Sequence, residues 1–264
     1  MQEVLIVFVL TAIIHAVETL SYAVRLAGVR LGKLAVALSL TGIIVLVSRT
    51  SNLIQAPLTG KVVDAARADP AFDLLLPLQG IVMAASIGTL AAMLLVPTFV
   101  RLSSRLIVHL ELAGSVPQLM RESVSIDKLR RVRSHLRRPT WSMLSRLRIG
   151  GIPKRLLLLN AIVTAFYTVG VLASLYASYL SPAHSLAASQ SSGLINGIAT
   201  IVMTIFVDPQ VALLTERAMR GDATQAEMNK MFGLLMFSRF VGTLLAQLLI
   251  IPGGYWLAWV VSIL

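Results

Sequence analysis

A few ionisable side chains stand inside long apolar stretches of this sequence, where exposing each one to lipid would cost about 2.5 to 3.5 kcal/mol. Glu18 lies in the first stretch, with His15 one helical turn before it. Arg49 and Arg239 lie in two others, and each directly follows a serine. Because such groups must face protein or water, they are the first candidates for a site that binds a charged solute.

Two interpretations of these residues stay open. His15 and Glu18 could ligate a metal ion, but two ligands without a third are weak grounds for a metal site. A structural ion pair between Glu18 and an arginine is more economical, and Arg49 is one possible partner, which would then only hold two helices together. The alternative is that Arg49 is the leading residue of a binding site.

The residues around Arg49 are unusually polar for an apolar window. Ser48, Arg49, Thr50, Ser51 and Asn52 are consecutive, and Gln55 and Pro57 follow. This density favours a segment that lines a wet cavity, and the missing N–H of Pro57 favours a local break in its helix. In the second half of the chain, the Asp208-Pro209 pair is either a helix-ending turn or a gate. The candidate binding residues are Arg25, Ser48, Arg49, Asn52, Gln55 and Arg239, and the candidate gating or coupling residues are His15, Glu18 and Asp208.

The composition identifies the elements that position these side chains as membrane spans. Of the 264 residues, 56% are hydrophobic and 13% are charged, and the mean hydropathy is +0.82; soluble proteins carry about 25% charged residues. A span needs roughly 20 apolar residues. Six windows qualify: 4–24, 34–56, 77–100, 156–180, 186–207 and 231–252. Because these windows contain stretches that are apolar on every side, they indicate helices rather than barrel strands. In the fifth window, Gly193-x-x-x-Gly197 predicts close helix packing.

The distribution of lysine and arginine predicts the orientation. Thirteen of them fall in residues 101–155 and three each in 25–33 and 208–230, against two, Lys61 and Arg67, on the other side. Since basic residues mark the cytoplasmic side, the N-terminus is expected outside. Segment 101–155 is expected to be either a basic amphipathic helix on the anionic inner leaflet or a plain connector. No recognition motif for nucleic acid, no phosphate loop for nucleotide and no cysteine occurs, and the sequence indicates no cofactor.

Two short strings recur at nearly equal offsets and predict a duplication. Residues 56–61 and 212–217 share the pattern A-x-L-T-x-(K/R), and residues 88–95 and 242–249 share six of eight positions, beginning Gly-Thr-Leu. Three spans in each half, an odd number, would insert the halves in opposite orientations, as in many transporters. The expected fold is therefore all-α and polytopic: a first repeat (1–100), a basic cytoplasmic connector (101–155) and a second repeat (156–264). The second repeat would end in an interfacial tail with Tyr255, Trp256 and Trp259.

The polar residues of the chain form several distinctive strings. They are HAVETLSY (15–22), RLAGVR (25–30), SRTSN (48–52), QAPL (55–58), SGLING (192–197), VDP (207–209), SR (238–239) and GTLLAQ (242–247). These strings resemble the Amj family, bacterial membrane proteins that flip lipid II, the undecaprenyl-pyrophosphate-linked peptidoglycan precursor, and that are alternates to the unrelated MurJ flippase. The resemblance covers nearly the whole chain.

The resemblance implies a lipid II flippase in the bacterial cell membrane. Its substrate carries a pyrophosphate, which the planar guanidinium groups of Arg49 and Arg239 would suit. We expect alternating access between the two halves, driven by gradients because no nucleotide site is present. The alternatives are a membrane-embedded enzyme acting on polyprenyl phosphates, with His15 and Glu18 as acid and base or metal ligands, and an integral scaffold of the cell-wall machinery that docks enzymes through segment 101–155.

Overall fold

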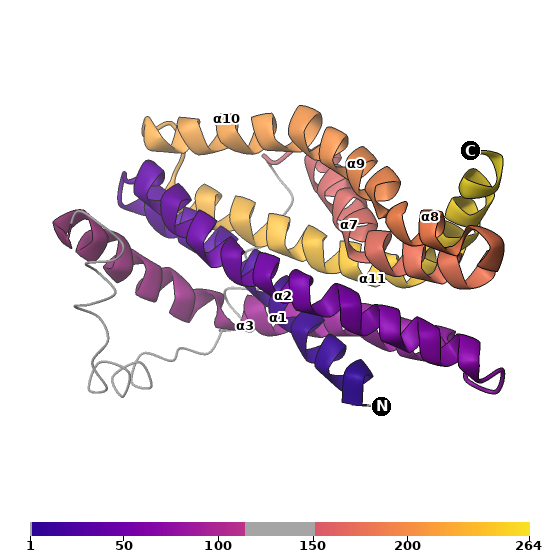
Figure 1. Cartoon of the computed structure of the whole chain (residues 1–264). Helices are drawn as coiled ribbons and strands as arrows, with labels where there is room; N and C mark the ends of the chain where they lie inside the picture. Colours follow the sequence, from indigo (N-terminus) through magenta and orange to yellow (C-terminus); the bar gives the residue numbers. More distant parts are fainter. Residues whose placement is uncertain (1, 114–150) are drawn as a thin grey trace.

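The computed structural model describes residues 2–113 and 151–264, and these residues form helices and short connections with no strand (Figure 1). Six helical stretches are long and apolar enough to cross a membrane. The predicted all-α, six-span membrane protein is therefore confirmed. Five of the spans are single helices: α1 (Gln2–Arg30), α2 (Leu34–Ala68), α3 (Leu75–Ala113), α7 (Lys154–Leu180) and α11 (Gln225–Ile263).

The fifth span along the chain is built from short pieces. It contains η2 (Pro182–His184), α8 (Ser185–Gln190), α9 (Ser192–Val202), a π-helical turn η3 (Met203–Val207) and α10 (Asp208–Met219). The N–H of Asp208 bonds the carbonyl of Met203, five residues back. This wider turn precedes Pro209, which has no N–H of its own. The Asp208-Pro209 pair therefore does not end the helix, contrary to one of the two expectations, and the span continues to Met219.

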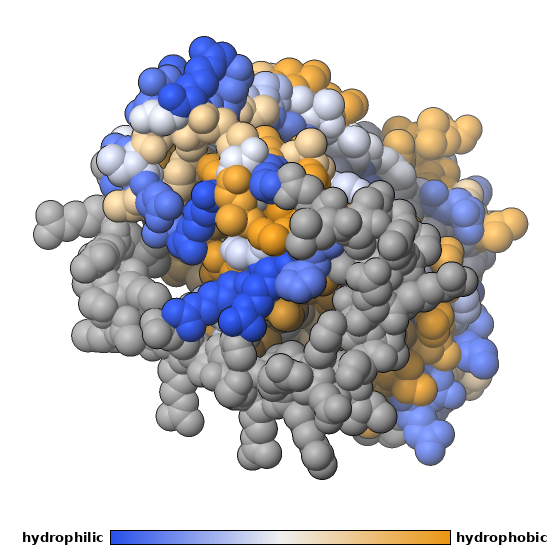
Figure 2. Space-filling model, turned by 90° about the vertical axis from the view of Figure 1, so that its left-hand side faces the viewer, coloured by the Kyte–Doolittle hydropathy of each residue, from blue (hydrophilic) through white to orange (hydrophobic). Residues whose placement is uncertain are grey.

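Within each half, the first helix is the one against which the others pack. α1 packs along α2 and α3, and α7 packs along α11 and α9. The halves meet mainly where α11 contacts α3 and α1 and where α2 contacts α7. α1 and α10 end at one end of the bundle, while α2 and α7 end at the other (Figure 1). Figure 2 faces the end where α1 and α10 stop, and hydrophilic residues gather at its top.

One glycine of the repeated Gly-Thr-Leu string makes a similar contact in each half. A Cβ added at Gly88 of α3 would lie 2.1 Å from the carbonyl oxygen of Ala12 in α1. A Cβ added at Gly242 of α11 would lie 2.4 Å from that of Ala161 in α7. The third helix of each half thus touches the backbone of the first at this string. The inverted repeat stays a prediction, but a duplication would account for this correspondence.

Two local expectations were wrong. α2 continues without a break through Pro57. α11 likewise continues through Pro252 to Ile263, so residues 255–263 are helical, and their interfacial position stays a prediction. Neighbouring helices can satisfy the carbonyl that a proline leaves free, so a proline need not break a membrane helix. Gly193 and Gly197 are not packing sites, since a Cβ at either one would have nothing within 4 Å.

The structure describes only the two ends of the predicted basic connector 101–155. α3 extends beyond the predicted window end at residue 100 and reaches Ala113. Residues 114–150 of this segment lie outside the described residues, so the choice between an amphipathic helix and a plain connector stays a prediction.

Candidate functional site

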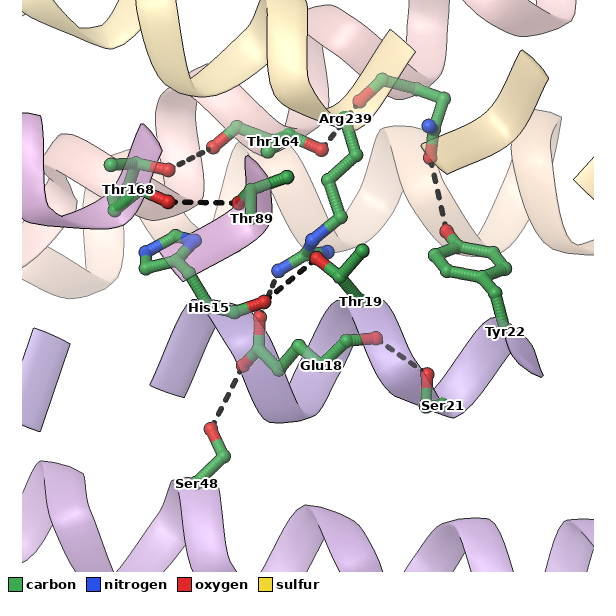
Figure 3. Close-up of polar contacts among 12 residues, drawn as sticks. His15, Glu18, Thr19, Ser21, Tyr22, Ser48, Thr89, Thr164, Thr168 and Arg239 are labelled. Carbon is green, nitrogen blue, oxygen red and sulfur yellow. Dashed lines mark hydrogen bonds and ion pairs between the residues drawn. The ribbon is translucent and has the colours of Figure 1, made fainter. Parts of the chain in front are cut away.

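An ion pair between Glu18 of α1 and Arg239 of α11 joins the two halves of the chain. The Arg239 guanidinium donates to Oε2 of Glu18 (Figure 3). The side chain of Arg239 is 13% exposed and that of Glu18 is 33% exposed. The pair is thus largely shielded by protein, but its carboxylate is not sealed.

A third helix contributes to the same carboxylate. Ser48 of α2 is buried, and its hydroxyl donates to Oε1 of Glu18 over 3.0 Å. Figure 3 shows Ser48 approaching from the side opposite Arg239, so each carboxylate oxygen has its own donor. The expected ion pair of Glu18 with an arginine is present, but the partner is Arg239 and not Arg49.

His15 lies beside this pair and is buried at 7% exposure. Its carbonyl accepts from the hydroxyl of Thr19 over 2.7 Å, while its ring Nδ1 has no hydrogen-bond partner among the described residues. A buried ring nitrogen without a partner costs free energy, which marks a place where a proton, a water or a ligand atom would be stabilising. In the described parts of the chain, no group of three His, Asp or Glu side chains could hold a metal ion.

A second buried polar contact lies next to the ion pair and centres on Asn160 of α7. Its amide nitrogen donates to Ser238 Oγ over 2.6 Å and to the Leu235 carbonyl over 3.0 Å, both on α11. Its amide oxygen accepts from the hydroxyl of Tyr22 on α1 over 3.4 Å. Sequence reasoning missed Asn160, although it is the single amide side chain between residues 155 and 180.

The Asn160 contacts set the orientation of α11. Ser238 directly precedes Arg239, so a helix held by Ser238 against α7 turns the next side chain toward α1. Hydrogen bonds between membrane helices each contribute modestly, about 0.6 to 2 kcal/mol, but they fix the relative rotation of the helices.

The other predicted residues are not joined to the pair by any hydrogen bond or ion pair among the described residues. Arg49 and Asn52 are exposed on α2, and Gln55 is buried with its amide oxygen unpaired. Arg25 lies with its guanidinium carbon 5.9 Å from the ring centre of Tyr22, and Asp208 is exposed at the start of α10. The structure thus brings His15, Glu18, Ser48 and Arg239 together.

The guanidinium of Arg239 is chemically suited to more than one kind of anion. A guanidinium has five donors in a plane and binds a carboxylate or a phosphate equally well in geometric terms. The guanidinium of Arg239 is bound to Glu18. Arg49, which follows Ser48 in the sequence, has no hydrogen bond or ion pair with any described residue. An incoming phosphate oxygen could therefore replace the Glu18 carboxylate on Arg239.

Comparison with known proteins gives two matches over almost the full chain. The family model Amj, described as alternate to MurJ, matches residues 10–261. The lipid II flippase Amj of Bacillus subtilis (strain 168) is 41% identical over 258 residues, which are 97% of this chain and 96% of that protein. No solved structure matches the chain.

Proposed function

The chain belongs to the Amj family, the alternates to MurJ, and on this premise we propose that it is a lipid II flippase of a bacterial cell membrane. The named relative carries that activity in its name and aligns with nearly the whole chain. The six apolar helices fit a protein that works within the bilayer. The substrate is then lipid II, moved from the inner to the outer leaflet.

The headgroup of lipid II presents the main physical problem. Its pyrophosphate and sugars would cost tens of kcal/mol to move bare through hydrocarbon on an idealised Born estimate. A flippase must therefore offer a hydrated path with positive charge, while the polyprenyl chain stays in the bilayer. The observation that carries this mechanism is the Glu18–Arg239 pair, a partly exposed charge contact between the two halves.

In the proposed binding step, the pyrophosphate takes the place of Glu18 on Arg239. A doubly charged group with several oxygens competes well for a planar donor fork. Arg49 adds a second guanidinium, and Asn52 and Gln55, on the same helix, add polar groups. Arg25 would meet the headgroup nearer the end of α1. Glu18, once released, keeps its bond to Ser48 and lies beside His15, where it could take up a proton.

The proposed transport step is alternating access between the two three-helix halves. Hydrogen bonds join the halves at both ends of the bundle: Arg30 of α1 donates to Asn229 of α11 over 2.5 Å, and Arg67 of α2 donates to Ser185 of α8 over 2.7 Å. Opening at one end would require breaking one of these contacts while the other holds. Asp208 is proposed as a gating residue, since it begins α10 directly after the π-helical turn of the fifth span.

The proposed orientation has the N-terminus outside and segment 101–155 on the anionic inner leaflet. Two negative charges moving outward down an inside-negative potential of about 100 mV would release roughly 4 to 5 kcal/mol. The membrane potential alone would then suffice to drive flipping. Dissipating the potential should slow export of labelled lipid II, and unchanged export would rule out this energy source but not the flippase function.

The function is tested by rescue of bacterial cells depleted of their other lipid II flippase. The wild-type chain should restore growth, whereas Arg239→Ala and Arg49→Ala should not. Arg220→Ala removes an exposed arginine that pairs with Glu216 at the C-terminal end of α10, and it serves as the matched control that keeps rescue. Failure of the wild type would overturn the proposal, and full rescue by both site variants would remove the proposed site. Mass spectrometry of lipid II after incubation with purified protein should show no covalent change.

A further inference from the structure

An apolar pocket lies in the second half, between α7, α9 and α11. It encloses about 300 Å³, at the lower end of the range of ligand pockets. Its walls include Phe166 and Val169 of α7, Ile195 and Ile198 of α9, and Leu249 and Trp256 of α11. None of these residues belongs to the ion-pair site.

α11 contributes Pro252 and Gly253 to the lining of the pocket. A Cβ added at Gly253 would lie 3.3 Å from that of Ala173 and 3.7 Å from a methyl of Ile195, so the glycine lets α11 approach α7 and α9 closely here. Ile198 is 49% exposed and Trp256 is 40% exposed, so the pocket reaches the outer surface of the helices. In a membrane this surface faces hydrocarbon.

Two polar side chains of α7 and α9 are close in sequence to residues that line the pocket. Tyr167 follows Phe166 on α7, and Thr200 lies two residues after Ile198 on α9; their hydroxyls are 2.7 Å apart and exposed. The seam between α7 and α9 therefore changes from apolar to polar along its length.

The distance along α11 favours a long chain. Leu249 comes ten residues after Arg239 and Trp256 seventeen, which at 1.5 Å per residue correspond to roughly 15 and 25 Å. Half of the hydrocarbon core is about 15 Å thick. A chain whose head lies at Arg239 and which fills the pocket must be longer than one leaflet. An undecaprenyl chain meets this condition, whereas a phospholipid acyl chain is matched to a single leaflet.

We propose that this pocket, here called the chain pocket, binds the isoprenoid chain of the lipid-linked substrate. The proposal rests on the proposed function, because the head of the same molecule is placed at Arg239. The pocket holds part of the chain while the rest stays in the bilayer. Its aromatic walls at Phe166 and Trp256 suit the flat, unsaturated isoprene units.

Photo-crosslinking of the full-length purified protein in lipid nanodiscs tests this. One probe is undecaprenyl phosphate with a photoreactive group in its chain, and the other is phosphatidylglycerol with the same group in an acyl chain. The isoprenoid probe should label peptides of α9 and α11 that line the chain pocket, and a tenfold excess of unlabelled undecaprenyl phosphate should remove most of the label. Equal labelling by the phosphatidylglycerol probe, or no competition, would overturn the proposal.

Variants that fill the chain pocket test whether the isoprenoid probe is bound there. Ile198→Trp and Gly253→Leu each fill the chain pocket and should reduce isoprenoid labelling about tenfold. The matched control is Leu248→Trp, which adds the same ring on α11 at a side chain that is 72% exposed and outside the pocket lining. If Gly253→Leu fails to fold, Ile198→Trp still decides, because its side chain is half exposed.

A parallel lipid II flipping assay separates the two proposals. Flipping without specific labelling of the pocket would disprove the chain pocket and leave the flippase intact. Specific labelling without any flipping by the wild type would disprove the flippase and leave a binding site for isoprenoid chains.

Discussion

Ser238 and Arg239 are neighbours on α11, yet they bind different helices: Ser238 accepts a hydrogen bond from Asn160 of α7, and Arg239 pairs with Glu18 of α1. The first contact lies within the second half of the chain and the second crosses to the first half. The adjacent positions therefore couple the internal packing of one half to its contact with the other. A movement of α11 relative to α7 would change the ion pair directly.

Reversing the charges of Glu18 and Arg239 distinguishes a binding role from a structural one. Glu18→Arg or Arg239→Glu alone places like charges together in a largely shielded site, so each should lower the melting temperature and abolish rescue. The double reversal should recover most of the stability but not transport, because the guanidinium then starts from α1 instead of α11. Melting in detergent and rescue of depleted cells measure the two effects. Full transport by the double reversal would show that the pair only holds helices together.

Arg239→Lys separates the effect of the positive charge from that of the planar guanidinium group. It keeps the positive charge near Glu18 but replaces the planar fork by a point charge. Stability should change little, whereas the initial rate of lipid II flipping in proteoliposomes should fall about tenfold. Unchanged flipping would show that charge alone is sufficient at this position.

Asn160→Leu should weaken both the fold and the site. It removes the bonds to Ser238 and Leu235 and leaves the Ser238 hydroxyl without that donor, at a cost of about 1 to 3 kcal/mol. Because α11 then loses its rotational constraint, rescue should fall as well. The control is Thr168→Val, because among the described residues the Thr168 hydroxyl bonds only to the Thr164 carbonyl of its own helix. Equal stability of the two variants would contradict the proposed role of Asn160.

The spans could be predicted from the sequence because burial in lipid demands long apolar helices, whichever neighbours they have. Glu18, Ser48 and Arg239 could be named for the same reason, since polar groups in such helices need partners. The partner of Glu18 could not be predicted: Arg239 is 221 positions away, and its direction depends on how α11 is rotated against α7. Asn160 was missed because a single amide side chain in an apolar stretch does not form a recognisable sequence motif.

Four glycines show that helix packing, like the partner of Glu18, could not be predicted from the sequence. Gly193 and Gly197 have the glycine spacing of a packing motif but face open space, whereas Gly88 and Gly242 have no second glycine four residues away and touch backbone. Close packing depends on which face of a helix meets its neighbour, and spacing alone does not contain that information.

Gly88→Ala and Gly242→Ala should therefore destabilise the protein. Each added methyl would collide with a backbone carbonyl, which cannot move as a flexible side chain can. We expect a loss of about 1 to 3 kcal/mol, typical of overpacking. Gly193→Ala is the matched control and should be neutral or stabilising by up to about 1 kcal/mol, because alanine favours the helix. Thermal unfolding of the three variants in one detergent measures the difference, and a destabilised control would contradict the packing argument.

The contacts that join the halves at the two ends of the bundle can be locked one at a time, since the chain contains no cysteine. The pairs are Arg30→Cys with Asn229→Cys at one end, and Arg67→Cys with Ser185→Cys at the other. Alternating access requires each end to open in turn, so a bifunctional thiol reagent on either pair should stop flipping, and cleavage of the linker should restore it. The pair Glu216→Cys with Arg220→Cys, at the C-terminal end of α10, controls for the reagent. Continued flipping with both ends locked would exclude rocking of the halves, because neither end could then open.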